Sequence, residues 1–437
     1  MRRTLLTFGL IAALLASYAC VRKDGSGTGG SESGPIIVGL YGDLSGQTSS
    51  FGQSTRNGAQ MAVEEINAAG GINGRQVKLL VEDDQGQPAQ AATVVTKLIN
   101  QDKVHAVLGE VASTNSLAAA PVAQSAKVPM ITPSSTNPKV TEVGDYIFRV
   151  CFIDPFQGGV MAKFAANTLK AKTAAVLGDF NSDYSKGMTQ YFEEEFNRDG
   201  GRVIVKQNYT QTDPDFKAQL TSIRNANPDV IFVPGYYGQV GVIAKQAREL
   251  GIQKPLLGGD GWDAPQLWDL GGEALANSYI SNHYSIDDPS PLIQKFVSAY
   301  RARYNGLAPD AIAALGYDAM NVLADSIKRA GSTDPTKLRD AIAQTKNFAG
   351  VTGNITLNEK RNAVKPAVVL KLEPAGRKFI YVETIQPEGA ATTTATPAAA
   401  TSPSAASSPA ASPAASKPAS ATEPPPPPPA SNKNTKP

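Results

Sequence analysis

Short apolar runs alternate with longer stretches of helical periodicity between residues 35 and 386. The runs are apolar on both faces, which is typical of strands in a parallel sheet that helices cover on both sides. Two helical stretches, 52–69 and 184–199, end at Gly-Gly pairs, which favour a left-handed helix stop. The expected strands are residues 36–42, 77–83, 104–110, 128–132, 146–152, 173–179, 202–209, 229–236 and 254–260.

These strands are too many for one compact sheet, and two β-α series meet near Asp154. Repeated β-α units predict α/β sheets with right-handed crossovers, so we expect two doubly wound α/β lobes. Ligands of such sheets bind beyond the carboxyl ends of the strands, where loops lead into helix N-termini. Polar and aromatic residues gather at these ends, in segments 43–46, 110–116, 134–136, 179–184, 235–237 and 260–262.

The first twenty residues have the pattern of an export signal, with Arg2 and Arg3 before an apolar run at 5–15. That run is shorter than the roughly 20 residues that span a bilayer. Cys20 resembles the lipid-modified cysteine of bacterial lipoproteins, and this is the interpretation that we favour. Residues 17–19 (SYA) also suit ordinary signal peptidase, which would leave a soluble protein. Either cleavage places the protein in the periplasm or at the cell surface.

Two low-complexity segments flank the body. Residues 21–34 are polar and rich in Gly and Ser, as in a flexible linker. They contain a G-x-G-x-x-G pattern that precedes the first strand, whereas a dinucleotide site needs it after a strand. Residues 387–437 consist mainly of Ala, Ser, Thr and Pro and include six consecutive prolines at 424–429, so we expect a disordered tail.

Composition excludes several classes of function. The net charge is +2, and no dense Lys/Arg cluster lies in the body, so a nucleic-acid partner is not expected. Two cysteines and two histidines provide no metal or haem site, and no cofactor is expected. Cys151 is expected to be a small buried apolar residue. The chain has no G-x-S-x-G elbow, no P-loop and no set of metal ligands, so we do not expect an enzyme.

Several motifs, in order, resemble one family. They are VGLYGDLSGQTSSFGQSTRNGAQMAVEEINAAGGING, VEDDQGQPAQAATVVTKLI, GEVASTNS, MITPSST, DFNSDYSKG and PGYYGQVGVIAKQARELG. Together they are similar to the Leu/Ile/Val-binding proteins that serve ABC transporters for branched-chain amino acids. The resemblance implies a bilobed type I periplasmic-binding fold and a monomer whose partners are an amino acid and an ABC permease.

The resemblance also implies where the chain divides. Three crossings between the lobes are expected near Asp154, Tyr284 and Phe348. One lobe would contain residues 35–153 and 285–347, and the other would contain residues 154–284 and 348–386.

The family's amino-acid site can be transferred residue by residue. Ser113 takes the position that binds the ligand carboxylate, Ser134 contributes backbone groups, and Thr136 contributes its amide and hydroxyl. The second lobe would contribute Tyr184, Tyr236 and Asp260. Phe51 would lie near the pocket for the ligand side chain. Two departures matter: Asp260 replaces a longer Glu that pairs with the ammonium, and Ala112 replaces a disulfide cysteine.

Physical chemistry explains why these residue types suit a zwitterion. Both charges of an amino acid need partners when they leave water. Hydroxyls of Ser113 and Thr136, with the N-terminal amides of a helix, are suitable donors for the carboxylate. Asp260 is then the one protein charge opposite the ammonium.

From pattern alone, a purely structural role is as common as the binding role for Ser113 and Asp260 and more common for Ser134, Tyr184 and Tyr236. Ser and Thr after strands are commonly caps or turn residues, Tyr184 and Tyr236 can be packing residues, and Asp260 can close a turn. Trp262 fits either a pocket wall or the edge of the lobe. Both histidines, His105 and His283, are expected to be structural, and residues 83–84 to form a solvated loop or a cap.

The resulting hypothesis is an exported solute-binding protein that captures an amino acid, of aliphatic or branched-chain type, by hinge closure and delivers it to an ABC permease. Two alternatives stay open. The ligand can be an amide, urea or another small acid, or the same closure can serve a surface sensor.

Overall fold

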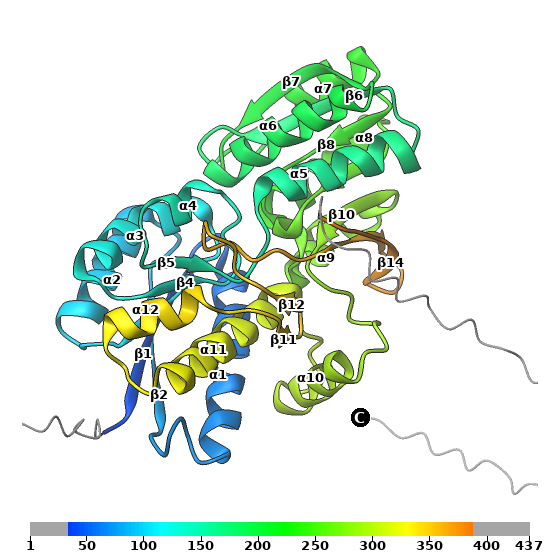
Figure 1. Cartoon of the computed structure of the whole chain (residues 1–437). Helices are drawn as coiled ribbons and strands as arrows, with labels where there is room; N and C mark the ends of the chain where they lie inside the picture. Colours follow the sequence, from blue (N-terminus) through cyan, green and yellow to red (C-terminus); the bar gives the residue numbers. More distant parts are fainter. Residues whose placement is uncertain (1–33, 388–437) are drawn as a thin grey trace, which may run out of the picture. The chain divides into compact units, whose positions relative to one another are not determined.

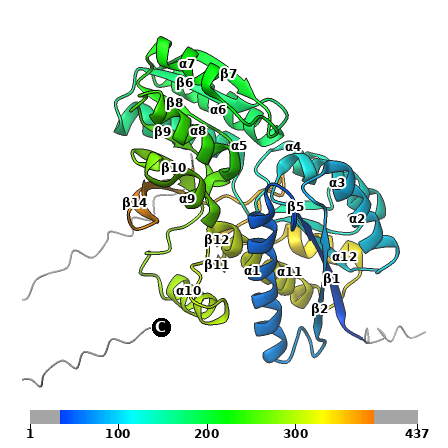
Figure 2. The same cartoon turned by 180° about the vertical axis from the view of Figure 1, so that it is seen from behind.

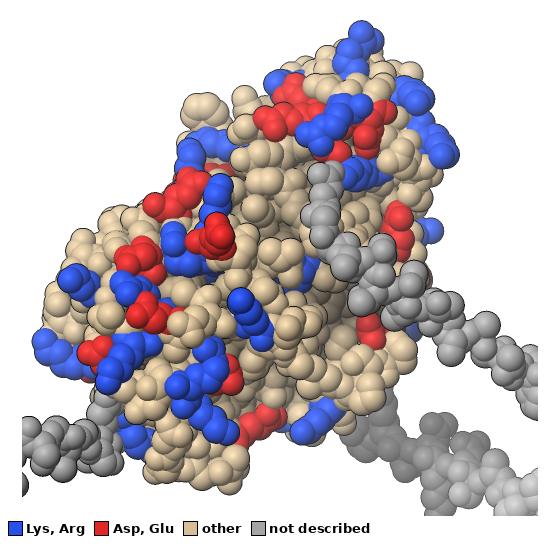
Figure 3. All heavy atoms as spheres, in the orientation of Figure 1, with Lys and Arg blue, Asp and Glu red and all other residues tan. Residues whose placement is uncertain are grey.

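The computed structural model describes residues 34–387. The predicted export signal, Cys20, nearly all of the predicted linker and the predicted tail therefore lie outside the described residues. Among the described residues, no helix is both long enough and apolar enough to cross a membrane. Figure 3 shows acidic and basic side chains interspersed over the face that it draws.

The first sheet is entirely parallel and has the strand order β2-β1-β3-β4-β5. Its strands are β1 (Ile36–Gly42), β2 (Val77–Asp83), β3 (Ala106–Leu108), β4 (Met130–Thr132) and β5 (Ile147–Arg149). One core packs α1 (Ser49–Ala68), α11 (Ala311–Ala330) and α12 (Pro335–Ala343) against it. A second core packs α2 (Pro88–Asn100) and α3 (Ser113–Ala126) on the opposite face (Figure 1). We call this unit lobe 1.

The second sheet has seven strands in the order β14-β13-β10-β9-β8-β6-β7. The parallel part consists of β6 (Thr173–Asp179), β7 (Arg202–Tyr209), β8 (Val230–Phe232), β9 (Leu256–Gly258) and β10 (Ser278–Asn282). Two antiparallel strands, β13 (Ala367–Glu373) and β14 (Lys378–Ile385), complete one edge. The order of the parallel strands matches that of the first sheet, with a switch point between β6 and β8.

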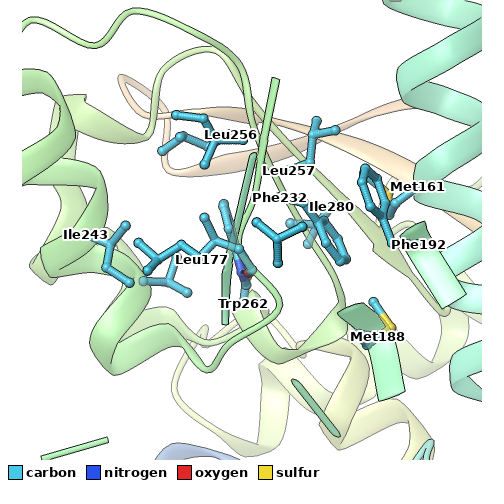
Figure 4. Packing of buried hydrophobic residues seen from close by; sticks show 14 of the residues in the cluster. Met161, Leu177, Met188, Phe192, Phe232, Ile243, Leu256, Leu257, Trp262 and Ile280 are labelled. Carbon is cyan, nitrogen blue, oxygen red and sulfur yellow. Dashed lines mark hydrogen bonds between the residues drawn. The ribbon is translucent and has the colours of Figure 1, made fainter. Parts of the chain in front are cut away.

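The helices of this second unit, lobe 2, enclose one continuous core. The core contains residues of α5 (Asp154–Lys163), α6 (Asp183–Arg198), α7 (Lys217–Ala226), α8 (Tyr237–Glu249) and α9 (Pro265–Gly271). Figure 4 shows Trp262 with Phe232, Leu177 and their neighbours in this core. The remaining elements are α4 (Lys139–Glu142), η1 (Phe164–Thr168), η2 (Asp260–Trp262), η3 (Gly272–Leu275), α10 (Pro291–Arg303), β11 (Phe348–Gly350) and β12 (Gly353–Ile355).

The chain passes three times between the two sheets and the helices that cover them. The first passage falls between Cys151 and Phe152, and the second between Ile280 and Tyr284. The third falls between Ala363 and Ala367, later than the expected position near Phe348. The short hairpin of β11 and β12 causes this difference, because its Ile355 packs into the core of lobe 1.

The fold class that the sequence predicts is confirmed. The predicted helices correspond to α1 and α6, and both are followed by glycines with positive φ, Gly70 and Gly200. Strands β10, β13 and β14 were not predicted. Figure 2, seen from behind, shows α1 and α11 side by side, as in Figure 1.

The contact between α1 and α11 depends on a glycine. A Cβ atom added to Gly58 of α1 would lie 1.9 Å from the backbone oxygen of Ala313 in α11. We therefore expect Gly58→Ala to lower the free energy of unfolding by about 2–3 kcal/mol, because the helices must separate. Gly238→Ala in α8 is the control, since a Cβ there meets no atom within 4 Å and alanine favours a helix. Urea denaturation compares the two variants, and equal stabilities would contradict this packing.

Candidate functional site

The predicted site residues lie at the carboxyl ends of strands in both lobes, and all seven are buried. In lobe 1, Ser113 is the first residue of α3, while Ser134 and Thr136 follow β4. In lobe 2, Tyr184 is in the first turn of α6, and Tyr236 directly precedes α8. Asp260 begins η2 after β9, and Phe51 lies in the first turn of α1.

The loop after β4 is held by a buried arginine. Arg149 Nη2 donates a hydrogen bond of 2.7 Å to the carbonyl oxygen of Asn137, and Nη1 donates to that of Ser135. The hydroxyl of Ser135 is used within lobe 1, because it donates to the carbonyl oxygens of Glu110 and Val111. Ser135 is therefore a structural loop residue, as its sequence pattern suggests.

The neighbouring hydroxyls have no such internal use. The hydroxyl oxygens of Ser134 and Thr136 are buried and have no hydrogen-bond partner within residues 34–387. Ser113 Oγ accepts a hydrogen bond of 3.2 Å from the backbone N–H of Asn137. A hydroxyl that accepts one hydrogen bond still has its own proton to donate. Lobe 1 therefore offers three hydroxyl donors at the start of α3 and after β4.

Asp260 is 4% exposed and accepts hydrogen bonds from uncharged donors of three different segments. Its Oδ1 lies 2.8 Å from Gln157 Nε2 and 3.0 Å from the hydroxyl of Tyr184. Its Oδ2 lies 2.9 Å from His283 Nε2. An ionised carboxylate can accept about four hydrogen bonds, so these three leave room for one more donor.

Burial fixes the protonation of two of these donors. It lowers the pKa of His283 to about 4, so the ring is neutral at pH 7. Because Asp260 can only accept, the proton of this neutral ring is on Nε2. Burial, followed by the charge of Asp260, raises the pKa of Tyr184 well above its usual value, which keeps its hydroxyl a donor. The His283 ring also stacks on Phe152, with 3.8 Å between the ring centroids.

An aromatic wall adjoins the acid. The rings of Tyr184 and Tyr236 stack with 5.3 Å between their centroids. Phe51 of lobe 1 meets Tyr236 and Tyr237 edge-to-face, at centroid distances of 5.7 Å and 5.0 Å. Such edge-to-face pairs are favourable arrangements of aromatic quadrupoles.

Polar contacts join the lobes in two places. In the first, the backbone of Asp183 donates to Thr114 Oγ1 (3.0 Å) and accepts from Asn137 Nδ2 (2.8 Å). In the second, the hydroxyl of Tyr237 donates to Gln47 O (3.2 Å) and accepts from Ser50 N (3.3 Å). We call these two sets of hydrogen bonds the Asp183 latch and the Tyr237 latch. Neither uses any of the seven predicted site residues.

A polar cavity of about 310 Å³ lies beside the wall and is lined by both lobes. Lobe 1 contributes Thr48, Gln85 and Thr114, among others, and lobe 2 contributes Asn181, Ser182 and Tyr236. Of the seven predicted site residues, Tyr236 alone lines this cavity, so the cavity adjoins the group around Asp260 and does not contain it. Within the described part of the chain, no cluster of His, Cys, Asp or Glu can hold a metal ion.

The site region contains more ionisable groups than the sequence analysis predicted, which expected Asp260 to be the one protein charge there. Arg149, Asp154 and Lys365 are also buried nearby. Burial lowers the pKa of Lys365 to about 8 and raises the pKa of Asp154 to about 8. The Thr136 hydroxyl and the charge of Arg149 oppose this rise in the pKa of Asp154.

Four residues that bond the predicted site residues or the loop beside them had no site role in the sequence analysis. His283 was expected to be structural, and Gln157, Arg149 and Asp154 had no predicted site role. Trp262 is fully buried and donates from Nε1 to Val233 O, so it belongs to the core of lobe 2. Residues 83–84 were expected to form a solvated loop or a cap; Asp84 is fully buried, and its Oδ1 accepts a hydrogen bond of 2.9 Å from the backbone N–H of Gly86. Cys151 is buried, as predicted.

Comparison with known proteins decides the family. The sequence profile of the periplasmic binding protein family matches residues 35–377. This chain belongs to the periplasmic binding protein family. Its members bind solutes for transporters outside the cytoplasm and are not enzymes, which agrees with the prediction.

Individual relatives support the branched-chain amino acid group of type I periplasmic binding proteins. The leucine-, isoleucine-, valine-, threonine- and alanine-binding protein of Pseudomonas aeruginosa is 32% identical over 327 residues, which are 74% of this chain and 86% of the relative. A leucine-binding protein LivK from Thermotoga maritima, known from a crystal structure, is 40% identical in sequence to this chain. The structural match covers 80% of this chain and 99% of the LivK chain, with a TM-score of 0.77.

A third comparison includes a bound ligand. The branched-chain amino acid transporter substrate-binding protein LivJ from Streptococcus pneumoniae, solved in complex with isoleucine, is 36% identical to this periplasmic binding protein. The match covers 81% of this chain and 100% of LivJ, with a TM-score of 0.77.

Proposed function

We propose that this protein captures an amino acid between its two lobes outside the cytoplasm and delivers it to an ABC permease. The observation that carries the proposal is the buried carboxylate of Asp260, which has three uncharged donors and room for one more. An α-ammonium group is a donor of matching charge, and charge-assisted hydrogen bonds are the stronger class. The family and its amino-acid-binding relatives support the same conclusion.

The carboxylate of the ligand would face lobe 1. The hydroxyls of Ser113 and Thr136 are suitable donors, and Ser134 adds its own hydroxyl and its backbone groups. The first N–H groups of α3 have no partner within the helix, and the positive end of the helix dipole favours an anion there. Arg149 lies behind this loop and adds positive charge without direct contact with the ligand.

The ligand side chain would pack against Phe51, Tyr184 and Tyr236. An aromatic wall of this kind favours an apolar side chain, which gains about 25 cal/mol for each Å² removed from water. An aliphatic or branched-chain amino acid is therefore the ligand that we propose.

Binding would act through lobe closure. A ligand can shift the population only by its excess affinity for the closed form, and a nearly complete shift needs about 5 kcal/mol. Hydrogen bonds to both lobes provide such a preference. The Asp183 and Tyr237 latches add to it, since they join the lobes directly.

We propose further that Cys20 carries a lipid that anchors the mature protein to a membrane. The export signal with its terminal cysteine supports this proposal. An anchor of this kind would hold the binding lobes close to a membrane-embedded permease.

The first test is a thermal-shift screen of the protein after denaturation and refolding have removed any bound ligand. A tight ligand should raise the melting temperature by mass action, and we expect leucine, isoleucine or valine among the strongest. If no amino acid shifts the melting temperature at millimolar concentration, the proposed function is wrong.

Asp260→Asn tests the partner of the ammonium. It should weaken amino-acid binding by about 10- to 100-fold, the value of a hydrogen bond to a charged group, as measured by calorimetry. Binding of 4-methylpentanoate, which lacks the ammonium group of leucine, should change less than about 3-fold. Asp269→Asn, at an exposed acid of lobe 2, is the control and should change neither affinity. Equal losses for both ligands in Asp260→Asn would reject this role.

Tyr237→Phe tests the contribution of the latch. Loss of its two hydrogen bonds should raise the dissociation constant of every ligand by about 3- to 10-fold and leave the order of preference unchanged. Most of the change should appear as faster dissociation in stopped-flow experiments. Tyr304→Phe is the matched control, because the hydroxyl of Tyr304 donates a hydrogen bond to Asn57 O within lobe 1. An effect on one ligand only would contradict the latch.

Cys20→Ala tests the anchor. The wild type should sediment with membranes, and this variant should stay in the soluble extract after cell lysis. Cys151→Ala is the control, since it removes the other cysteine and should leave the protein in the membrane fraction. Identical fractionation of wild type and Cys20→Ala would exclude lipid attachment at this residue.

A further inference from the structure

A buried lysine lies in the third passage between the lobes. Lys365 is 2% exposed and lies between Ala363 of the lobe 1 core and Ala367 of the lobe 2 core. Its Nζ donates a hydrogen bond to Thr352 Oγ1. Among the described residues this hydroxyl is the hydrogen-bond partner of the ammonium group, so two of its three N–H donors are unused. Burial of a charge with so few partners is costly, so such a group indicates a role beyond the stability of the fold.

A buried acid of lobe 1 holds the lysine through that threonine. Asp318 of α11 accepts hydrogen bonds from Val351 N (2.8 Å), Thr352 N (2.8 Å) and Thr352 Oγ1 (2.7 Å). Because the Thr352 hydroxyl gives its proton to Asp318, its oxygen is free to accept from Lys365. This chain of hydrogen bonds fixes the ammonium group at the third passage.

The lysine also acts on the other two passages. At the first passage, burial raises the pKa of Cys151 to about 12, and the charges of Arg149 and Lys365 oppose this rise. At the second passage, burial lowers the pKa of His283 to about 4, and the charge of Lys365 acts in the same direction. The His283 ring stacks on Phe152, which directly follows the first passage. One ammonium group therefore lies within electrostatic reach of all three passages.

The His283 ring can take up a second proton only at Nδ1. Its Nε2 lies 2.9 Å from Asp260 Oδ2, and Nδ1 is buried without a hydrogen-bond partner within residues 34–387. A proton on Nδ1 would create a buried N–H group that has no acceptor there, within reach of an ammonium charge that repels it. The position of the ring and the nearby positive charge thus both oppose its protonation.

The neutral ring matters for the ligand. A protonated His283 would form an ion pair with Asp260 and repel an incoming α-ammonium group, whereas the neutral ring donates one hydrogen bond and leaves the charge of Asp260 for the ligand. The other titratable groups that face the lysine and the histidine are Asp260, Asp318 and Cys151. Tyr184 adjoins them through its hydrogen bond to Asp260.

We propose that Lys365 is a positioning residue of the amino-acid site: its ammonium charge keeps the His283 ring neutral, so that the Asp260 carboxylate stays available to the ligand's α-ammonium in mildly acidic surroundings. This inference rests on the proposed function and specifies how the same site is protected from protonation. The lysine does not contact the ligand, and it acts through the histidine.

The first measurement follows the imidazole rings of the full-length protein by NMR. The chain contains two histidines, so His105, which accepts a hydrogen bond from Ile37 N in lobe 1, is an internal reference. In the wild type, the His283 signal should not titrate above about pH 5, and its nitrogen shifts should show the tautomer with the proton on Nε2.

Two variants of the lysine separate its charge from its packing. Lys365→Met replaces the ammonium with an apolar side chain of similar shape, and the midpoint of the His283 titration should rise by about one pH unit or more. Lys365→Arg retains the positive charge and should restore the wild-type titration of His283. The His105 signal should titrate alike in all three proteins. A purely structural lysine would not change the titration of a histidine in another passage.

The second measurement is calorimetric titration, at pH 5 and at pH 7, with the amino acid that gives the largest thermal shift. The ratio of the dissociation constant of Lys365→Met to that of the wild type should rise as the pH falls. The rise should reach up to about tenfold for each pH unit below the new His283 midpoint, because protons then compete with the ligand ammonium. Burial brings the pKa values of Asp84 and Asp310 to about 7, but both acids are present in both proteins and affect both members of the ratio. Lys371→Met, at an exposed lysine of β13, is the control, and its ratio should stay the same at both pH values.

The outcomes are distinguishable. If no amino acid binds the wild type, the proposed function itself fails. If an amino acid binds but His283 titrates alike in the wild type and Lys365→Met, or the affinity ratio does not depend on pH, the inference about Lys365 is wrong while the proposed function stands. Should Lys365→Met fail to fold, the wild type decides: a His283 ring that is protonated at pH 6, or that carries its proton on Nδ1, overturns the inference.

Discussion

The buried carboxylate of Asp260 is the constraint on which the arrangement of the site depends. A buried acid is stable only if its oxygens are hydrogen-bonded, and here the partners among the described residues are an amide, a phenol and a neutral imidazole rather than a Lys or Arg. Its donors come from α5, α6 and the segment that leads to α10, so the acid connects the ligand region to two of the three inter-lobe passages. Neutral donors stabilise the carboxylate and leave one hydrogen-bonding position on its oxygens for an incoming cation.

The two lobes differ in polarity in a way that orients a zwitterion. Lobe 1 presents hydroxyls and the N-terminus of α3, with Arg149 behind them, whereas lobe 2 presents Asp260. An amino acid bound in the opposite direction would place its carboxylate against an acid. The latches at Asp183 and Tyr237 then stabilise closure whatever the side chain of the ligand is.

The sequence predicted the parts of the fold that local pattern determines. Buried parallel strands appear as continuous apolar runs, and Gly-Gly pairs end α1 and α6. Strand β14 was missed because its residues are largely exposed. It lies at the edge of the sheet and pairs antiparallel with β13, so it lacks the continuous apolar run of a buried parallel strand. The bonds of Asp260 join residues 103, 76 and 23 positions apart, and no local pattern encodes them. Motif resemblance pointed to Asp260 and Thr136 as candidates, whereas the contacts of His283, Gln157 and Arg149 are visible only in three dimensions.

A crystal structure of the protein with its tightest amino acid would test this account most directly. We predict that the ligand nitrogen lies within about 3 Å of an Asp260 oxygen and that its carboxylate accepts from Thr136 and Ser113 on the opposite lobe. A ligand in the reverse orientation, or one bound away from both Asp260 and Thr136, would contradict it.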